Sequence, residues 1–165
     1  MDLTDSDGTD GPKTDMGWEI WPDGCNELLM RIAREYKSTP MEITKNGASY
    51  LGGPDTHGKI PDTRRMEYLR GYLSALGRAR KDGANIRGYH CWSLLDNFEW
   101  AEGYTQRFGL AYMDFRDQRR SIKESGEWYG RLAETGNLRS GNEVASQFHY
   151  VLQEGTPRKA AATRR

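Results

Sequence analysis

The chain has 165 residues, of which 36% are hydrophobic and 11% aromatic, a composition that fits one globular domain and excludes a disordered chain. Its 24 Lys and Arg balance 24 Asp and Glu, so no net charge draws it to nucleic acid or to an acidic membrane surface. Its two cysteines, Cys25 and Cys91, exclude a disulfide framework and have no partner at metal-binding spacing.

Localisation signals are absent from the sequence. No run reaches the roughly 18–20 apolar residues of a membrane span, and no basic-then-apolar segment opens the chain. Two lone cysteines are typical of a reducing compartment. We therefore expect a cytoplasmic protein with no membrane partner.

The first half of the chain alternates loops with regular elements. Residues 1–15 are rich in Asp, Gly and Thr and predict a loop leader. A helix is expected near 24–36, because four apolar residues fall on one helical face: Leu28, Leu29, Ile32 and Tyr36. A short strand at 41–44 follows, and the four glycines and two prolines of 46–61 predict a long loop.

The clearest helix is expected over 63–81. Asp62 or Thr63 can cap its start, and Gly83 suits the position after its end. A core stripe at spacings of three and four runs along it: Met66, Leu69, Leu73 and Leu76. Residues 86–94 then predict a strand parallel to the first, which completes one βαβ unit.

The remaining segments are an extended stretch, a helix and a tail. Residues 108–115 are expected to be extended, as one arm of a hairpin, and 123–133 to form the last helix. From 138 to 165 the composition predicts a flexible polar tail. The second parallel strand leads into a polar and aromatic cluster, Trp92 to Trp100, at the end of the strand where α/β barrels place their chemistry.

Three motifs give the chain a family resemblance. The segment from Trp92 to Trp100 and its continuation Ala-Glu-Gly-Tyr-Thr-Gln-Arg-Phe-Gly-Leu (101–110) resembles the C-terminal signature of glycoside hydrolase family 1, of the β-glucosidase type. Ile43-Thr-Lys-Asn-Gly resembles the Ile-Thr-Glu-Asn-Gly nucleophile motif of that family. Met16 to Pro22 looks like the stretch before the sixth barrel helix.

The resemblance implies an α/β fold, the C-terminal part of a (β/α)8 TIM barrel, over residues 16–137. A barrel of this kind needs eight parallel strands and about 250 residues. Because this chain supplies about two such strands, we expect the barrel to be incomplete and the chain to be a fragment. Its open strand edges then favour self-association.

The resemblance also implies a sugar site made of Trp92, Glu99, Trp100 and Phe108. An indole face at position 92 packs against the apolar face of a pyranose, and a carboxylate at 99 accepts two hydroxyl hydrogen bonds on the far side of the ring. The indole N–H of residue 100 donates to a neighbouring hydroxyl, and residue 108 lines the pocket. Since Glu99 repels a 6-phosphate, we expect a non-phosphorylated β-glucoside or related sugar, with no cofactor.

The catalytic carboxylates are missing. Lys45 occupies the position of the nucleophile, and an ammonium cannot stabilise an oxocarbenium-like transition state. Glu42 lies three residues away on a strand and should face the other side. The acid/base motif Asn-Glu-Pro has no match, since Asn26-Glu27-Leu28 lies on a predicted helix and lacks proline. We therefore expect an inactive fragment of a retaining β-glucosidase.

Two other functions fit the sequence. One is a non-catalytic carbohydrate-binding protein of the same family, and the other is a fragment that complements a separate N-terminal chain. A metal site is not expected, because His57 and His90 are isolated histidines better explained by loop and strand packing.

Overall fold

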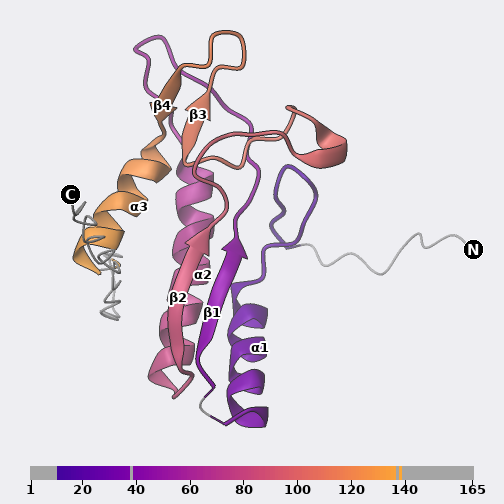
Figure 1. Cartoon of the computed structure of the whole chain (residues 1–165), viewed down its shortest axis with the longest axis vertical. Helices are drawn as coiled ribbons and strands as arrows, with labels where there is room; N and C mark the ends of the chain where they lie inside the picture. The colour runs from indigo at the N-terminus through magenta and orange to yellow at the C-terminus, as the bar shows by residue number, and fades with distance from the viewer. Residues whose placement is uncertain (1–10, 38, 137, 139–165) are drawn as a thin grey trace, which may run out of the picture.

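The computed structural model describes residues 11–37, 39–136 and 138, which form a two-stranded parallel sheet, three α-helices and a hairpin (Figure 1). In chain order the elements are α1 (Pro22–Glu35), β1 (Met41–Asn46), α2 (Thr63–Lys81), β2 (Ile86–Cys91), η1 (Trp100–Glu102), β3 (Ala111–Met113), β4 (Arg120–Ile122) and α3 (Glu124–Thr135).

The predicted βαβ unit is present. β1 and β2 are hydrogen-bonded in parallel, with Met41 opposite Ile86 and Asn46 opposite Cys91, and α2 connects them. α1 packs against α2, and α2 against α3. The carboxyl ends of both strands point toward the loops and the β3–β4 hairpin (Figure 1). The sheet therefore delivers residues 45–47 and 92–100 to the same end of the molecule.

Helix α2 has the predicted bounds and forms the centre of the core. Of the predicted stripe, Leu69 and Leu73 are fully buried, Leu76 is nearly so, and Met66 is half-buried. Gly83 has φ +102°, a left-handed conformation that glycine adopts without strain. Asp62 lies at the N-cap position but makes no capping bond. Its carboxylate instead accepts hydrogen bonds from Arg65 and from the distant Ser125, a partner that local sequence cannot indicate.

The second strand is shorter than predicted. It ends at Cys91, and the peptide between Trp92 and Ser93 is cis. From there the backbone leaves β1 and pairs with the 108–111 segment, as Ser93 N–H donates to Phe108 O and Ala111 N–H to Leu94 O. The predicted hairpin is confirmed, because β3 pairs antiparallel with β4.

The predicted terminal segments fall largely outside the described residues. Of the leader 1–15, residues 11–15 are described: they carry an antiparallel bridge between Lys13 and Glu19, and Thr14 is buried. Of the tail 138–165 only Leu138 is described, and its side chain is buried in the core.

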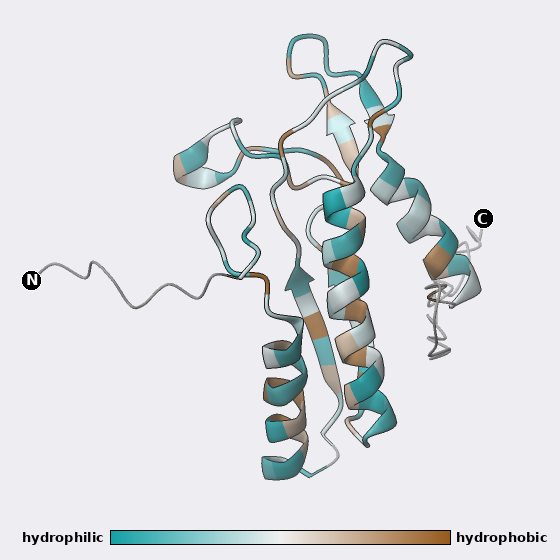
Figure 2. Cartoon of the chain, turned by 180° about the vertical axis from the view of Figure 1, so that it is seen from behind, coloured by the Kyte–Doolittle hydropathy of each residue, from teal (hydrophilic) through white to brown (hydrophobic). Residues whose placement is uncertain are grey.

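The predicted apolar face of α1 is only partly covered. Leu29 is buried, whereas Leu28 and Tyr36 are 58% and 64% exposed, so only part of the predicted apolar face packs against the described residues. The sheet of β1 and β2 has two strands, which leaves one edge of each without a strand neighbour among the described residues. Figure 2 shows that the middle of β1 is hydrophobic.

We expect the isolated chain to self-associate or to be marginally stable. Unpaired strand edges are templates for pairing with other chains, and apolar helix faces without packing partners do not offset the backbone entropy of about 1–2 kcal/mol per residue. Size-exclusion chromatography with thermal unfolding measures both properties. A strictly monomeric species that unfolds cooperatively above about 60 °C would contradict this expectation.

Candidate functional site

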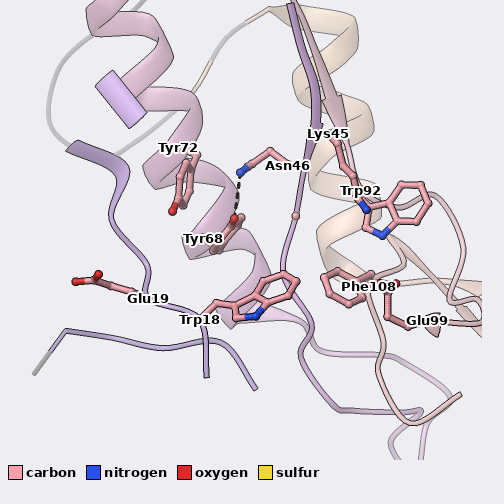
Figure 3. A pocket seen from close by; sticks show the side chains of 10 residues that line it. Trp18, Glu19, Lys45, Asn46, Tyr68, Tyr72, Trp92, Glu99 and Phe108 are labelled. Carbon is pink, nitrogen blue, oxygen red and sulfur yellow. Dashed lines mark hydrogen bonds between the residues drawn. The ribbon is translucent and has the colours of Figure 1, made fainter. Parts of the chain in front are cut away.

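A pocket of about 360 Å³ opens at the carboxyl ends of β1 and β2. Its lining residues are Trp18, Glu19, Lys45, Asn46, Gly47, Tyr68, Tyr72, Trp92, Glu99 and Phe108. Four of the five residues that the sequence singled out therefore share one cavity, and Figure 3 shows their side chains. The pocket combines aromatic faces with two carboxylates and one ammonium group, the kind of lining that binds polar ligands with an apolar face.

Trp100 is the predicted site residue that the pocket does not include. Its side chain is 81% exposed and stands at the first position of η1. A tight turn creates this placement: Glu99 N–H donates to Gly103 O at 2.7 Å, and Trp100 itself has φ +44°. The expectation that its indole reaches the sugar site is not met by this chain.

Lys45 and Asn46 at the end of β1 point in different directions, as alternation along a strand requires. Lys45 Nζ lies 4.3 Å from the centroid of the Trp92 ring, a cation–π contact. Asn46 is held from both sides: its amide N donates to Tyr68 OH at 3.1 Å, and its amide O accepts from Tyr89 OH at 2.7 Å. Figure 3 shows the first of these bonds.

A glycine brings the ends of the two strands together. A Cβ atom at Gly47 would lie 1.7 Å from the carbonyl oxygen of Trp92, so any other residue would push the two segments apart. Beside this contact, Trp92 N–H donates a hydrogen bond to Asn46 O at 2.8 Å. Gly47 is thus required for Lys45 and Trp92 to face one pocket.

Glu42 does not reach the pocket. Its carboxylate lies 3.8 Å from His90 Nε2 on an exposed part of the sheet, and it is not among the lining residues. The predicted opposite orientation of Glu42 and Lys45 therefore agrees with the structure.

Six of the ten lining residues were not predicted as site residues. Asn46 and Gly47 lie in the motif around Lys45, and the other four lie outside it. Trp18 packs against Phe108 with ring centroids 6.0 Å apart, and Glu19 follows it in the chain. Tyr68 and Tyr72 lie one turn apart on α2, with centroids 4.5 Å apart. The available signals were the Met16–Pro22 motif and an i, i+4 aromatic pair beside the core stripe of α2, but neither pattern says which cavity it faces.

A buried guanidinium joins the two loops that carry the site. The Arg65 side chain is 1% exposed and forms an ion pair with Asp62 at 2.6 Å. It also donates to four backbone carbonyls, those of Ala48, Tyr50, Arg107 and Phe108. Residues 48–50 follow the strand end that carries Lys45, and residues 107–108 include the pocket residue Phe108. Arg65 therefore fixes the distance between these two loops.

A second buried ionic cluster supports the loop that carries Glu99. The Asp96 carboxylate is fully buried and accepts from Lys123 Nζ at 2.9 Å, Arg107 Nη1 at 2.8 Å and Gly109 N at 2.8 Å. Burial, aided by the charge of Arg65, lowers the pKa of Lys123, and its ion pair with Asp96 opposes that shift. These contacts anchor the segment between Trp92 and Glu99 to the 107–113 chain.

The described residues contain neither a cluster of metal-binding side chains nor a membrane-spanning helix. No group of three or more His, Cys, Asp or Glu side chains there is arranged to hold a metal ion. No helix among those residues is long and apolar enough to cross a membrane. Cys25 and Cys91 are free thiols, and burial raises the pKa of Cys91 to about 12.

Comparison with known sequences supports the resemblance. The sequence model of glycosyl hydrolase family 1 matches residues 2–138. The chain is 46% identical to a 1,4-beta-D-glucan glucohydrolase of Thermotoga neapolitana, over 77% of this chain and 29% of that protein. It is 49% identical to beta-glucosidase A of Acetivibrio thermocellus (71% and 26%) and 40% identical to a 6-phospho-beta-galactosidase of Staphylococcus aureus (79% and 28%).

Solved structures give the same relationship. The family 1 β-glucosidase of Thermotoga maritima is 42% identical, and it superposes with a TM-score of 0.75 over 77% of this chain and 29% of its own. The same enzyme has been solved in complex with glucoimidazole, again with a TM-score of 0.75. The chain thus spans less than a third of the length of the relatives it matches.

Proposed function

The chain belongs to glycosyl hydrolase family 1, and we propose that it is the C-terminal part of a β-glucosidase-type barrel that binds a non-phosphorylated β-glycoside but does not hydrolyse it by itself. The observation that carries this proposal is the pocket at the carboxyl ends of β1 and β2, where Trp92, Glu99 and Phe108 line one cavity. The order of the motifs along the chain supports the position within the barrel.

Each lining residue has a role that its chemistry supports. Trp92 offers an indole face for the C–H face of a pyranose, and its Nε1–H is buried without a hydrogen-bond partner in the described residues. Glu99 supplies two carboxylate oxygens for ring hydroxyls and repels a 6-phosphate. Phe108 is 3% exposed and closes the pocket wall behind Trp18.

The missing chemistry supports inactivity. Retaining hydrolysis needs two carboxyl groups about 5–5.5 Å apart, one nucleophile and one acid/base. In this pocket the nucleophile position holds Lys45. The two carboxylates that do line it, Glu19 and Glu99, come from segments that do not match either catalytic motif.

We expect no turnover of an aryl β-glucoside by the purified chain, and none after Lys45→Glu alone, because that change restores neither the acid/base nor the rest of the pocket wall. Release of 4-nitrophenol from 4-nitrophenyl β-D-glucoside measures this. Hydrolysis that copurifies with the chain and survives Glu42→Gln would refute the claim of inactivity.

Sugar binding is tested separately from turnover. Methyl β-D-glucoside should shift the indole N–H signal of Trp92 in two-dimensional NMR spectra, with weak affinity because the proposed fragment carries only part of the sugar site. Trp92→Ala should abolish binding, whereas Trp100→Ala, which removes an equally large but exposed indole, should leave it unchanged. Equal losses in the two variants would show that the pocket is not the sugar site.

Complementation by a separate N-terminal chain is a second candidate, favoured by the exposed apolar surface. Trp21, Leu28 and Tyr36 are each more than half exposed, and both strands of the sheet keep a free edge among the described residues. Co-expression with the remaining part of a family 1 barrel should yield a stable complex. Failure of the two chains to copurify would count against this function.

A further inference from the structure

The pocket contains an ammonium group that forms no ion pair with the described side chains. The Lys45 ammonium stands over the Trp92 ring at 4.3 Å. None of the ion pairs among the described residues includes it. A cation–π contact weakly stabilises a cation and leaves its hydrogen-bond donors available. Three N–H donors are therefore open to a ligand.

The two carboxylates of the pocket limit where an anion can bind. Glu99 and Glu19 line the same cavity, and each repels a negative group placed beside it. In the view of Figure 3, Lys45 and Glu99 lie on opposite sides of the Trp92 ring, and Glu19 lies well away from both. A ligand that stacks on Trp92 can thus present an anion to Lys45 only from the end of its ring that is remote from Glu99.

We propose that this pocket selects a hexopyranose with an anionic group at its anomeric carbon, a sugar 1-phosphate, over both the neutral glycoside and the 6-phosphate. The proposal rests on the proposed function, which orients the ring hydroxyls toward Glu99 and the anomeric carbon toward Lys45. The pyranose packs against the part of the Trp92 indole that the Lys45 ammonium leaves open, the hydroxyls bind Glu99, and the phosphate pairs with the ammonium. Substitution of a carboxylate by Lys45 has then changed the ligand class rather than only removing a catalytic group.

The proposed function also indicates which anomer of the sugar 1-phosphate should bind. The nucleophile of a retaining β-glycosidase approaches the anomeric carbon from the face opposite the β-linked leaving group. Because Lys45 stands at that position, the phosphate of an α-linked 1-phosphate points toward its ammonium, whereas that of the β anomer points away. The probe is therefore α-D-glucose 1-phosphate.

The expected preference is modest because Lys45 is solvent-exposed. Exposed ion pairs contribute little, so α-D-glucose 1-phosphate should bind about twofold to fivefold more tightly than methyl β-D-glucoside. Glucose 6-phosphate has the same charge at the other end of the ring and should bind more weakly than either. High salt should reduce the preference, since exposed charges are screened.

The test is an NMR titration of the full chain with these three ligands, for the wild type and for Lys45→Gln. Lys45→Gln should make the 1-phosphate no tighter than methyl β-D-glucoside. The matched control is Lys59→Gln, a lysine in the 46–61 loop that does not line the pocket, which should keep the preference. The spectrum of each variant before titration, compared with that of the wild type, establishes that the variant is folded.

The outcomes separate the two proposals. If methyl β-D-glucoside binds but the 1-phosphate and 6-phosphate bind equally, or if the preference survives Lys45→Gln, the assignment of an anion-selective pocket is wrong and the sugar site stands. If none of the three sugars binds, both the sugar site and its anion preference are overturned.

Discussion

Lys45→Glu should raise the β-glucosidase activity of a completed barrel by on the order of 10⁵-fold or more, the size of effect seen when a covalent nucleophile is removed from other enzymes. The completed barrel would be a chimera in which this chain replaces the matching part of the Thermotoga maritima β-glucosidase, to which it is 42% identical. The host supplies the part of the β-glucosidase that this chain does not cover.

The physical reason is the charge at the reacting carbon. The transition state of glycoside hydrolysis carries positive charge, which a carboxylate stabilises and the Lys45 ammonium destabilises. Lys45 lies at the carboxyl end of β1 and faces Trp92 in the pocket, which is where we propose that the family nucleophile stands.

The measurement compares two rates of 4-nitrophenyl β-D-glucoside hydrolysis, that of the chimera with Lys45 and that of its Lys45→Glu variant. Glu42→Gln in the active variant serves as the control and should leave the rate unchanged, since Glu42 faces His90 outside the pocket. Equal rates for the two side chains at position 45 would mean that this residue is not at the nucleophile position.

Arg65→Met should lower the free energy of unfolding by about 3–5 kcal/mol, the usual cost of breaking a buried ion pair from one side. The change leaves the Asp62 carboxylate with Ser125 as its remaining side-chain donor. It also removes the side-chain donor from four backbone carbonyls. We expect the urea midpoint of the variant to fall far below that of the wild type.

The neighbouring arginine provides a matched control. Arg64 pairs with Asp15 at 2.7 Å, but its side chain is 57% exposed, and exposed pairs contribute about 0–1 kcal/mol. Urea denaturation followed by tryptophan fluorescence should therefore separate Arg65→Met from Arg64→Met clearly. Similar midpoints for the two variants would show that the Arg65 cluster does not hold the two loops together.

Local patterns in the sequence were enough to locate the regular elements. The stripe of α2 and Gly83 after its end set both ends of that helix, and the hydrophobic runs predicted β1, β2 and α3 within a few residues. The motifs around Lys45 and Trp92 identified the family and most of the pocket. These features can be predicted because periodicity, turn residues and short motifs depend on neighbours in the chain.

The folded structure decided the rest. Trp100 turns to solvent in a local turn closed by the bond from Glu99 N–H to Gly103 O, although its motif places it in the site. The other outcomes depend on residues far apart in sequence. Asp62 does not cap α2, because its carboxylate binds the buried Arg65 and, 63 positions away, Ser125. Tyr68 faces the pocket because Asn46 binds it across 22 positions. A linear pattern cannot specify such partners, since burial and hydrogen bonding are settled only when distant segments meet.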